Sequence, residues 1–92
     1  NKNINTAYVN CKETANMTLQ GFGTKIDGSP VALTDIGALS NTTSSLKTLK
    51  LAVPATFKNL SSFGIALKSS GAVDADFEVN DIQIVYREKT LR

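Results

Sequence analysis

The sequence predicts an all-β protein that folds as a single antiparallel β-sandwich with a jelly-roll-like connection. Apolar and polar residues alternate in several short segments, and this period of two is typical of half-buried strands. Gly, Pro, Ser and Asn separate these segments, and none has the apolar spacing of a convincing amphipathic helix. We expect about seven or eight short strands. An immunoglobulin-like sandwich is the alternative, although the sequence contains no Trp and a single Cys.

Length and composition are those of one small globular domain that spans residues 1–92. The chain is 41% hydrophobic and 20% charged, which are ordinary values for such a domain. No apolar run approaches the roughly 20 residues that cross a bilayer, so no membrane insertion is expected. The net charge of +2 is too small to predict nucleic-acid binding. Because the chain begins with Asn1 and not with Met, we expect a fragment of a longer polypeptide.

Two strands and a hairpin are predicted in the N-terminal part of the chain. Their apolar faces consist of Ala7, Val9 and Cys11 in the first strand and Ala15, Met17 and Leu19 in the second. This pattern makes Cys11, the only cysteine, a small buried apolar residue. Asp27-Gly28 separates the next two apolar pieces, and because Gly accepts positive φ at low cost, a hairpin turn is expected. Pro30 marks the following strand as a sheet edge, since proline has no N–H for the ladder.

The middle of the chain combines one irregular segment with two further strands. The stretch "LTDIGALSNTTSS" is rich in Ser, Thr and Asn, and it is predicted to be a surface loop with no more than one helical turn. A strand with Leu49, Leu51 and Val53 on one face then ends at Pro54. The two faces of the next strand are Phe63, Ile65 and Leu67 against Gly64, Ala66 and Lys68. Its small residues indicate close coverage by another strand or by another chain.

The last strand changes phase at Asn80-Asp81. Its apolar residues are Phe77 and Val79 before this point and Ile82, Ile84 and Tyr86 after it. An uninterrupted strand would turn one of these two groups away from the core. An extra residue at Asn80-Asp81 restores the phase, and Asn and Asp tolerate the local backbone and can bond its freed amides. We therefore predict a β-bulge at this position.

The residue types on which most hydrolytic enzymes depend are missing. The sequence has no His and one Cys, which excludes Ser-His-Asp and Cys-His nucleophiles and the usual zinc sites. Its carboxylates fall in polar turns or strand edges and not in an expected cleft. No enzymatic activity and no cofactor are therefore expected.

One acidic stretch has a spacing that would suit a hard cation. Asp74, Asp76, Glu78 and Asn80 are two residues apart and project to one side of an extended chain. Oxygen ligands of this kind hold Ca²⁺, but no glycine-containing ligand loop accompanies them. A solvated strand face that discourages edge-to-edge aggregation is the favoured interpretation.

Aromatic and amide side chains are the candidates for ligand binding. Sugar rings stack their apolar faces on exposed aromatic rings, while amides and carboxylates bind the hydroxyls. Tyr8 lies in the polar phase of its strand, and Phe22 and Phe57 lie near turns, whereas Phe63 and Phe77 are in the apolar phase and are predicted to be core. The full predicted site consists of Tyr8, Phe22, Asn41, Phe57 and Asn59. The alternatives are that Tyr8 covers a sheet edge and that the two amides are ordinary turn residues.

The ending "FGIALKSSGAVDADFEVNDIQIVYREKTLR" resembles the terminal segment of small β-sandwich modules in bacteriophage tail fibres, tailspikes and minor tail proteins. The shared pattern runs from a Ser-Phe-Gly strand through a variable turn to Val-Asn-Asp-Ile-x-Ile-Val-Tyr-Arg and a basic end. It covers about the last third of the chain. The matching residues are architectural in character and are Phe77, Val79, Asn80, Asp81, Ile82, Ile84, Tyr86 and Arg87. The resemblance therefore adds no binding-site residue.

The resemblance implies a module of a phage tail that is exposed on the virion, belongs to a longer polypeptide and often forms a homotrimer. Its function would be to bind host-surface glycan. The alternative is a structural module without a ligand, in which Gly64, Ala66 and their face of small residues lie between chains of the tail assembly.

Overall fold

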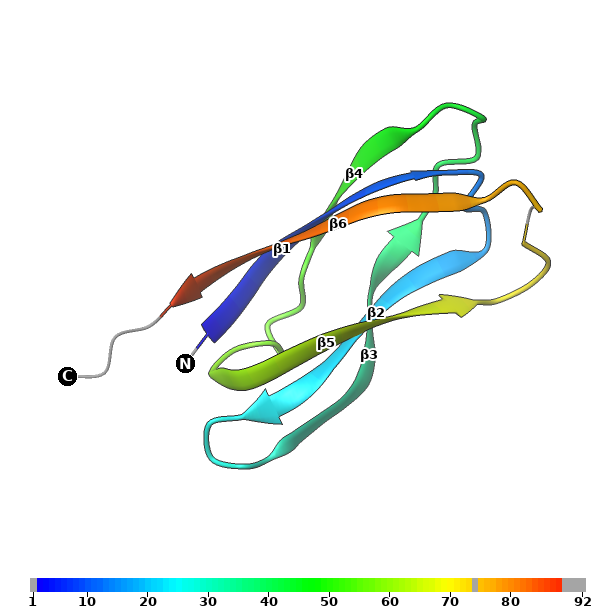
Figure 1. Cartoon of the computed structure of the whole chain (residues 1–92). Helices are drawn as coiled ribbons and strands as arrows, with labels where there is room; N and C mark the ends of the chain where they lie inside the picture. Colours follow the sequence, from blue (N-terminus) through cyan, green and yellow to red (C-terminus); the bar gives the residue numbers. More distant parts are fainter. Residues whose placement is uncertain (1, 74, 89–92) are drawn as a thin grey trace.

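The computed structural model describes residues 2–73 and 75–88, which form a 6-stranded structure without a helix in those ranges (Figure 1). The strands are β1 (Lys2–Lys12), β2 (Met17–Lys25), β3 (Pro30–Leu39), β4 (Lys47–Ala52), β5 (Leu60–Ser69) and β6 (Glu78–Glu88). Over the described residues, no helix is long and apolar enough to cross a membrane.

The strands form two antiparallel sheets that pack face to face (Figure 1). One sheet has the order β3-β2-β5, and the other has β1 at its centre between β4 and β6. The sheets meet at one corner, where Lys2 pairs with Leu60. The first strand thus pairs with the last, and the second pairs with the fifth. The prediction of an all-β antiparallel sandwich is confirmed, whereas the jelly-roll-like and immunoglobulin-like assignments stay predictions.

The core lies between the two sheets, and it is formed largely by every second side chain of the central strands β1 and β2. The buried apolar residues are Ile4, Ala7, Val9, Cys11, Met17, Leu19, Val31, Ile36, Leu39, Phe57 and Leu60. Cys11 is a free thiol with no exposed surface, as predicted. Ile4 and Ala7 both point inward although they are three residues apart, because the β1–β6 register shifts between Ile4 and Thr6.

The predicted bulge in the last strand is confirmed. The pairs on either side of it are Asn10–Asp81 and Cys11–Val79. Asn80 therefore has no residue opposite it in β1, and this extra residue lets both Val79 and Ile82 pack against the core. The Nδ2 of Asn80 donates a hydrogen bond to the Oδ1 of Asn10 at 3.3 Å, which links the bulge to the neighbouring strand.

The prediction of a surface loop for "LTDIGALSNTTSS" is wrong over its first half. Strand β3 continues to Leu39 and contributes Ile36 and Leu39 to the core. Two register shifts between β2 and β3 break the simple alternation of β3, so the period of two is not visible in its sequence. Within the described ranges β3 pairs only with β2, so the edge position that Pro30 predicted is confirmed. The described ranges contain fewer strands than expected, since β2 runs unbroken to Lys25.

The Asp27-Gly28 hairpin is confirmed, and its hydrogen bonds explain the sequence of the turn. The N–H of Gly28 donates to the carbonyl of Lys25 at 2.9 Å, and Gly28 has a φ of 91°, which a residue with a Cβ rarely adopts. The N–H of Lys25 donates to the carbonyl of Ser29 at 2.8 Å and closes the two-stranded ladder. The Oδ1 of Asp27 accepts the N–H of Ser29 at 2.8 Å.

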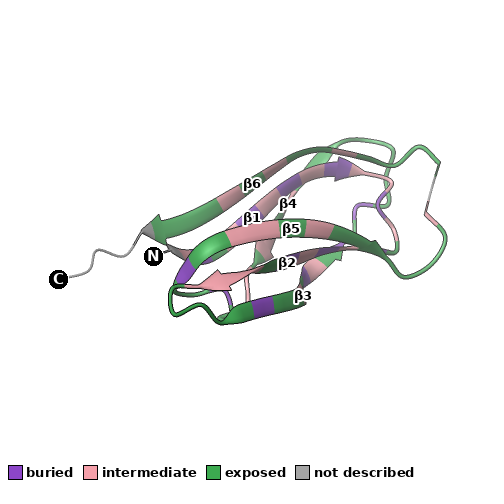
Figure 2. Ribbon diagram, turned by 60° about the horizontal axis from the view of Figure 1, so that its bottom comes forward, coloured by how far each residue is buried: buried purple, intermediate pink, exposed green. Residues whose placement is uncertain are grey.

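The side of the sandwich formed by β5 and β6 is less well covered than its centre (Figure 2). Phe77, which the sequence placed in the core, is 45% exposed, because it precedes the first residue of β6 instead of pointing inward from that strand. Ile65 and Leu67 are on the inner face of β5, as predicted, since the inward residues Gly21 and Leu19 of β2 lie opposite them. They are nevertheless exposed because β5 is at the edge of its sheet.

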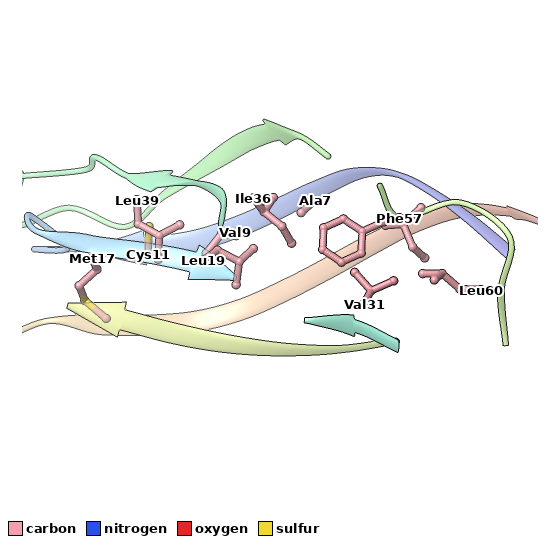
Figure 3. Close-up of a cluster of buried hydrophobic side chains, with 11 residues drawn as sticks. Ala7, Val9, Cys11, Met17, Leu19, Val31, Ile36, Leu39, Phe57 and Leu60 are labelled. Atoms are coloured by element: carbon pink, nitrogen blue, oxygen red, sulfur yellow. The ribbon is translucent and has the colours of Figure 1, made fainter. Parts of the chain in front are cut away.

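Truncating Phe57 and Phe77 tests this revised core. Phe57 has no exposed surface and lies at the end of the core remote from Met17 (Figure 3). We expect Phe57→Ala to lower the free energy of unfolding by about 3–5 kcal/mol, since it leaves a cavity. The same change at half-exposed Phe77 is expected to cost about 1 kcal/mol or less. Urea denaturation of both variants measures the difference, and equal losses would contradict the assignment.

The Asp27 turn predicts a component of stability that acid removes. Hydrogen bonds from the Ser29 side chain and then from its backbone N–H hold the pKa of Asp27 below its ordinary value. A carboxyl whose pKa is lowered by folding stabilises the native state above the unfolded-state pKa, and this contribution is lost as the pH falls through the folded-state pKa. The stability difference between wild type and Asp27→Asn should therefore shrink between near-neutral pH and about pH 3, as measured by urea denaturation. A constant difference would argue against it.

Candidate ligand-binding surface

The five residues predicted to bind a ligand are not brought together, and Phe57 is excluded because it has no exposed surface. Its ring makes an edge-to-face contact with Phe63, with ring centroids 5.3 Å apart and an interplanar angle of 87°. The Nζ of Lys25 donates to the carbonyls on either side of Phe57, those of Thr56 at 3.2 Å and Lys58 at 3.0 Å. These bonds draw the loop onto the sandwich and place the ring in the core.

Asn41 is buried and organises the loop between β3 and β4. Its Nδ2 donates to the carbonyls of Cys11 at 2.6 Å and Ser45 at 2.9 Å. Its Oδ1 accepts the N–H of Thr43 at 3.2 Å and the Thr43 hydroxyl at 2.6 Å. Both N–H groups and both lone pairs of the amide are thus used within the chain. The predicted ligand role of Asn41 is replaced by a structural one.

Asn59 and Tyr8 lie in separate places. Asn59 is exposed with a φ of 56°, its N–H donates to Asn3 Oδ1 at 2.9 Å, and its carbonyl accepts the N–H of Ile26 at 2.9 Å. Tyr8 is half-buried on the outer face of the β4-β1-β6 sheet, between Lys50 of β4 and Gln83 of β6. The two residues are therefore on different elements and do not form a common site with Phe22.

Of the five predicted residues, Phe22 is the one whose aromatic ring is exposed on the outer face of a sheet. Its neighbour Gly21 is buried, so Phe22 points to the outer face of the β3-β2-β5 sheet, where it is 43% exposed. Gly64 lies directly opposite Phe22 in β5. A methyl group added at Gly64 would be 2.7 Å and 2.9 Å from the Cε2 and Cε1 atoms of the ring, so the ring leans across the bare backbone of β5. An aromatic side chain over a cross-strand glycine covers the exposed backbone of that strand.

Polar groups surround the ring on the same face. Gln20 and Thr24 are two residues before and after Phe22 in β2, and therefore project to the same side of the sheet. The Nε2 of Gln20 donates to Asp35 Oδ1 of β3 at 2.8 Å, which fixes an amide and a carboxylate beside the ring. In β5, Ser62 is opposite Thr24. We refer to Phe22, Gln20, Thr24, Asp35, Ser62, Gly64 and Ala66 as the Phe22 surface.

The Phe22 surface is low and open because two of its members have little or no side chain. Gly64 and Ala66 lie opposite Phe22 and Gln20 and present no atoms beyond a Cβ. The small residues that were predicted to lie against a strand or another chain are thus covered in part by Phe22 of the same chain. A hydroxyl-rich ligand can approach the ring over β5 and reach the Gln20 amide and the second oxygen of Asp35, which accepts further hydrogen bonds.

The acidic stretch considered for Ca²⁺ is only partly described. Asp74 lies outside the described residues. Among residues 2–73 and 75–88, no group of three or more His, Cys, Asp or Glu side chains is placed to hold a metal ion.

No protein-family model, curated protein or solved structure matches the chain.

Of the seven residues of the Phe22 surface, sequence reasoning predicted only Phe22 as a ligand contact. It missed Gln20, Thr24, Asp35, Ser62, Gly64 and Ala66. Gln20 and Phe22 share a phase in "TLQGF", which was the available signal for the first. Asp35 falls in the segment predicted to be a loop, and its position beside Gln20 follows only from the shifted β2–β3 register. Gly64 is opposite Phe22 through a pairing between strands that are distant in the sequence.

The structural role of Asn41 is open to a direct test. Asn41→Ala leaves the buried carbonyl of Cys11 without its donor, and buried groups without a partner each cost about 1–3 kcal/mol. We therefore expect a loss of about 2–3 kcal/mol in the free energy of unfolding by urea denaturation. The neighbouring exposed residue provides the control, because Thr42→Ala is expected to change stability by about 0.5 kcal/mol or less. A neutral Asn41→Ala variant would reject the assignment.

Proposed function

We propose that this chain is a non-catalytic module of a bacteriophage tail protein that is exposed on the virion and binds host-surface carbohydrate. The Phe22 surface is the observation that carries the carbohydrate part of the proposal. An apolar ring that is 43% exposed lies among an amide, a carboxylate and hydroxyl groups on one open sheet face. A sugar ring needs this combination, with an aromatic face for its C–H groups and polar atoms for its hydroxyls.

The shape of the surface favours a polysaccharide chain over a small enclosed ligand. Small-molecule sites are concave and bury most of the ligand, whereas the Phe22 surface follows a sheet face that is bounded on the β5 side by Gly64 and Ala66. The groups around the ring are neutral except for Asp35. An extended glycan can lie across β2 and β5 with one sugar on Phe22 and its neighbours in solvent.

The phage part of the proposal rests on the resemblance of the chain's ending. Apart from Phe77, the matching residues lie in β6 with its bulge at Asn80, and β6 pairs with β1, the central strand of its sheet. The resemblance therefore falls mainly on the architecture of the sandwich. Of the Phe22 surface, the residues of β2 and β3 lie outside it, whereas Ser62, Gly64 and Ala66 of β5 lie within it. This division is the one expected of modules that keep a scaffold and vary their binding face.

The alternative is an assembly module without a ligand. The observation that favours it is the side of the sandwich between β5 and β6, where Ile65, Leu67, Phe77 and Tyr86 are all exposed. Exposed apolar groups that gather along sheet edges mark sites of association between chains.

Truncation of Phe22 and of Tyr8, which lie on opposite faces of the sandwich, tests carbohydrate binding at the Phe22 surface. The probe is an array of bacterial capsular and cell-wall polysaccharides. We expect Phe22→Ala to weaken binding at least about tenfold because it removes the stacking surface. Tyr8→Ala, on the other sheet, is the matched control and is expected to bind as wild type does.

Folding must be monitored because Phe22 also covers Gly64. Circular dichroism and thermal unfolding report on the fold of each variant, and Asp35→Asn supplies a second probe that leaves the ring in place. We expect Asp35→Asn to weaken binding several-fold without loss of stability, since it removes a charged acceptor at an exposed site. A wild-type protein that is folded and binds no polysaccharide on the array, or equal losses from Phe22→Ala and Tyr8→Ala, would overturn carbohydrate binding at this surface.

A further inference from the structure

Within the described part of the chain, strands β5 and β6 leave two sheet edges unpaired on the same side of the sandwich. Over these residues β6 pairs only with β1, and β5 pairs with β2 and, at one residue, with β1. On the opposite side Leu51 of β4 packs against Gly37 of β3, since a methyl group added at Gly37 would be 3.1 Å from Leu51 Cδ2. The sandwich is therefore closed along β3 and β4 and open along β5 and β6.

The open side is apolar and hollowed at both ends. One hollow is bounded by Phe63, Ile84 and Tyr86. The other is bounded by Leu67 and Phe77. The exposed fractions of the side chains along this side are 38% for Ile65, 45% for Leu67, 45% for Phe77 and 48% for Tyr86. An unpaired edge beside exposed apolar groups is a template for pairing with another strand.

We propose that β6 pairs antiparallel with β6 of a second copy of this chain, about a two-fold axis at Ile84. A two-fold axis perpendicular to the sheet pairs each residue of one strand with a residue of the other strand whose side chain is on the same face of the sheet. Only registers in which the axis passes at a residue meet this condition. In the register centred on Ile84, the opposed residues are Asp81 and Arg87, Ile82 and Tyr86, Gln83 and Val85, and Ile84 with itself. The Asp81 carboxylate of each copy then faces the Arg87 guanidinium of the other, and the inward side chains of Ile82, Ile84 and Tyr86 face one another.

Neighbouring registers lose this match. Centring the axis on Gln83 places Asp81 opposite Val85 and Arg87 opposite Val79 across the bulge. Centring it on Val85 places Arg87 opposite Gln83, and Asp81 then falls opposite a position beyond the last residue of β6. Strand β5 offers no equivalent, because self-pairing about Ile65 puts Lys68 opposite Ser62 and brings no opposite charges together. Charge complementarity thus favours β6 over β5, and of these three registers only the one centred on Ile84 pairs Asp81 with a cation inside the strand.

The pairing also explains the apolar side. The start of β5 and the end of β6 line the same hollow, so the two strands lie on the same side of the sandwich. The axis therefore brings β5 of one copy toward β5 of the other, where Ile65 and Leu67 are exposed. The β4-β1-β6 sheets of the two copies then form one continuous sheet, and the β3-β2-β5 sheets approach each other edge to edge. The exposed apolar residues of both copies are withdrawn from water.

One consequence rests on the proposed function. An axis perpendicular to the sheets maps the outer face of β3-β2-β5 onto the same face of the dimer, so the two Phe22 surfaces point in one direction. Two weak sites on one face bind a repeating polysaccharide with higher avidity than one. The dimer itself is independent of this consequence, because it is derived from β6 alone.

Complementary charge reversals test the register. Arg87→Asp places a second carboxylate opposite Asp81 of the other copy, and Asp81→Arg places two guanidinium groups opposite each other. Each variant alone should therefore dimerise at least about tenfold more weakly than wild type. Mixed in equal amounts, the two variants should form a heterodimer, since one chain then carries two arginines and the other two aspartates at the paired positions. Sedimentation equilibrium of the whole chain measures all three samples, with circular dichroism to verify folding.

Lys50→Asp is the matched control because it changes the net charge as Arg87→Asp does, but on exposed β4, and it is expected to leave the dimer intact. Restoration of the dimer in the mixture supports the proposed register, and it does not depend on glycan binding. A wild type that is monomeric at all concentrations up to millimolar, or trimeric as the resemblance implies, would overturn the proposal. A mixture that stays as weak as its two components would do the same.

Discussion

The rest of the sandwich depends on one constraint, which is that the apolar side chains of β1 and of the strands paired with it point to the same face of their sheet. β1 lies at the centre of its sheet, so its apolar side chains must face the other sheet while both of its edges are hydrogen-bonded. Two irregularities maintain this arrangement, an extra residue in β1 between Ile4 and Thr6 and another in β6 at Asn80. Without them Ile4 or Val79 would point to solvent, and one end of the core would be lost.

The same constraint decides where the Phe22 surface lies. Inward positions of β2 carry Met17, Leu19 and the buried Gly21, and a methyl group at Gly21 would be 3.0 Å from the rings of Phe57 and Phe63. The core is therefore full at this point, and Phe22 is turned outward by the pleat. Gly64 then gives the ring a place to lie, because no side chain of β5 competes for the space. The full core at Gly21 and the pleat of β2 thus leave the Phe22 ring exposed on the outer face of the sandwich.

The outer face and the open side have different physical characters, and they fit different partners. The Phe22 surface mixes one ring with hydrogen-bonding groups and suits a hydrated ligand. The side along β5 and β6 combines the edges of two sheets with apolar side chains, and it suits another strand. Because the two lie on separate faces of a small sandwich, occupation of one leaves the other accessible. The proposed pairing through β6 therefore leaves the Phe22 surface open to solvent.

The sequence by itself determined the features that depend on local pattern. Alternation at period two predicted strands and the buried Cys11, Asp27-Gly28 predicted the hairpin, and the phase change predicted the bulge at Asn80, because each depends on neighbours along the chain. Tertiary structure alone decided the burial of Phe57 and Asn41, the strand character of the segment around Ile36, and the meeting of Phe22, Asp35 and Gly64. Each of these depends on which strands pair and in what register, and that choice is made by packing between residues far apart in the sequence.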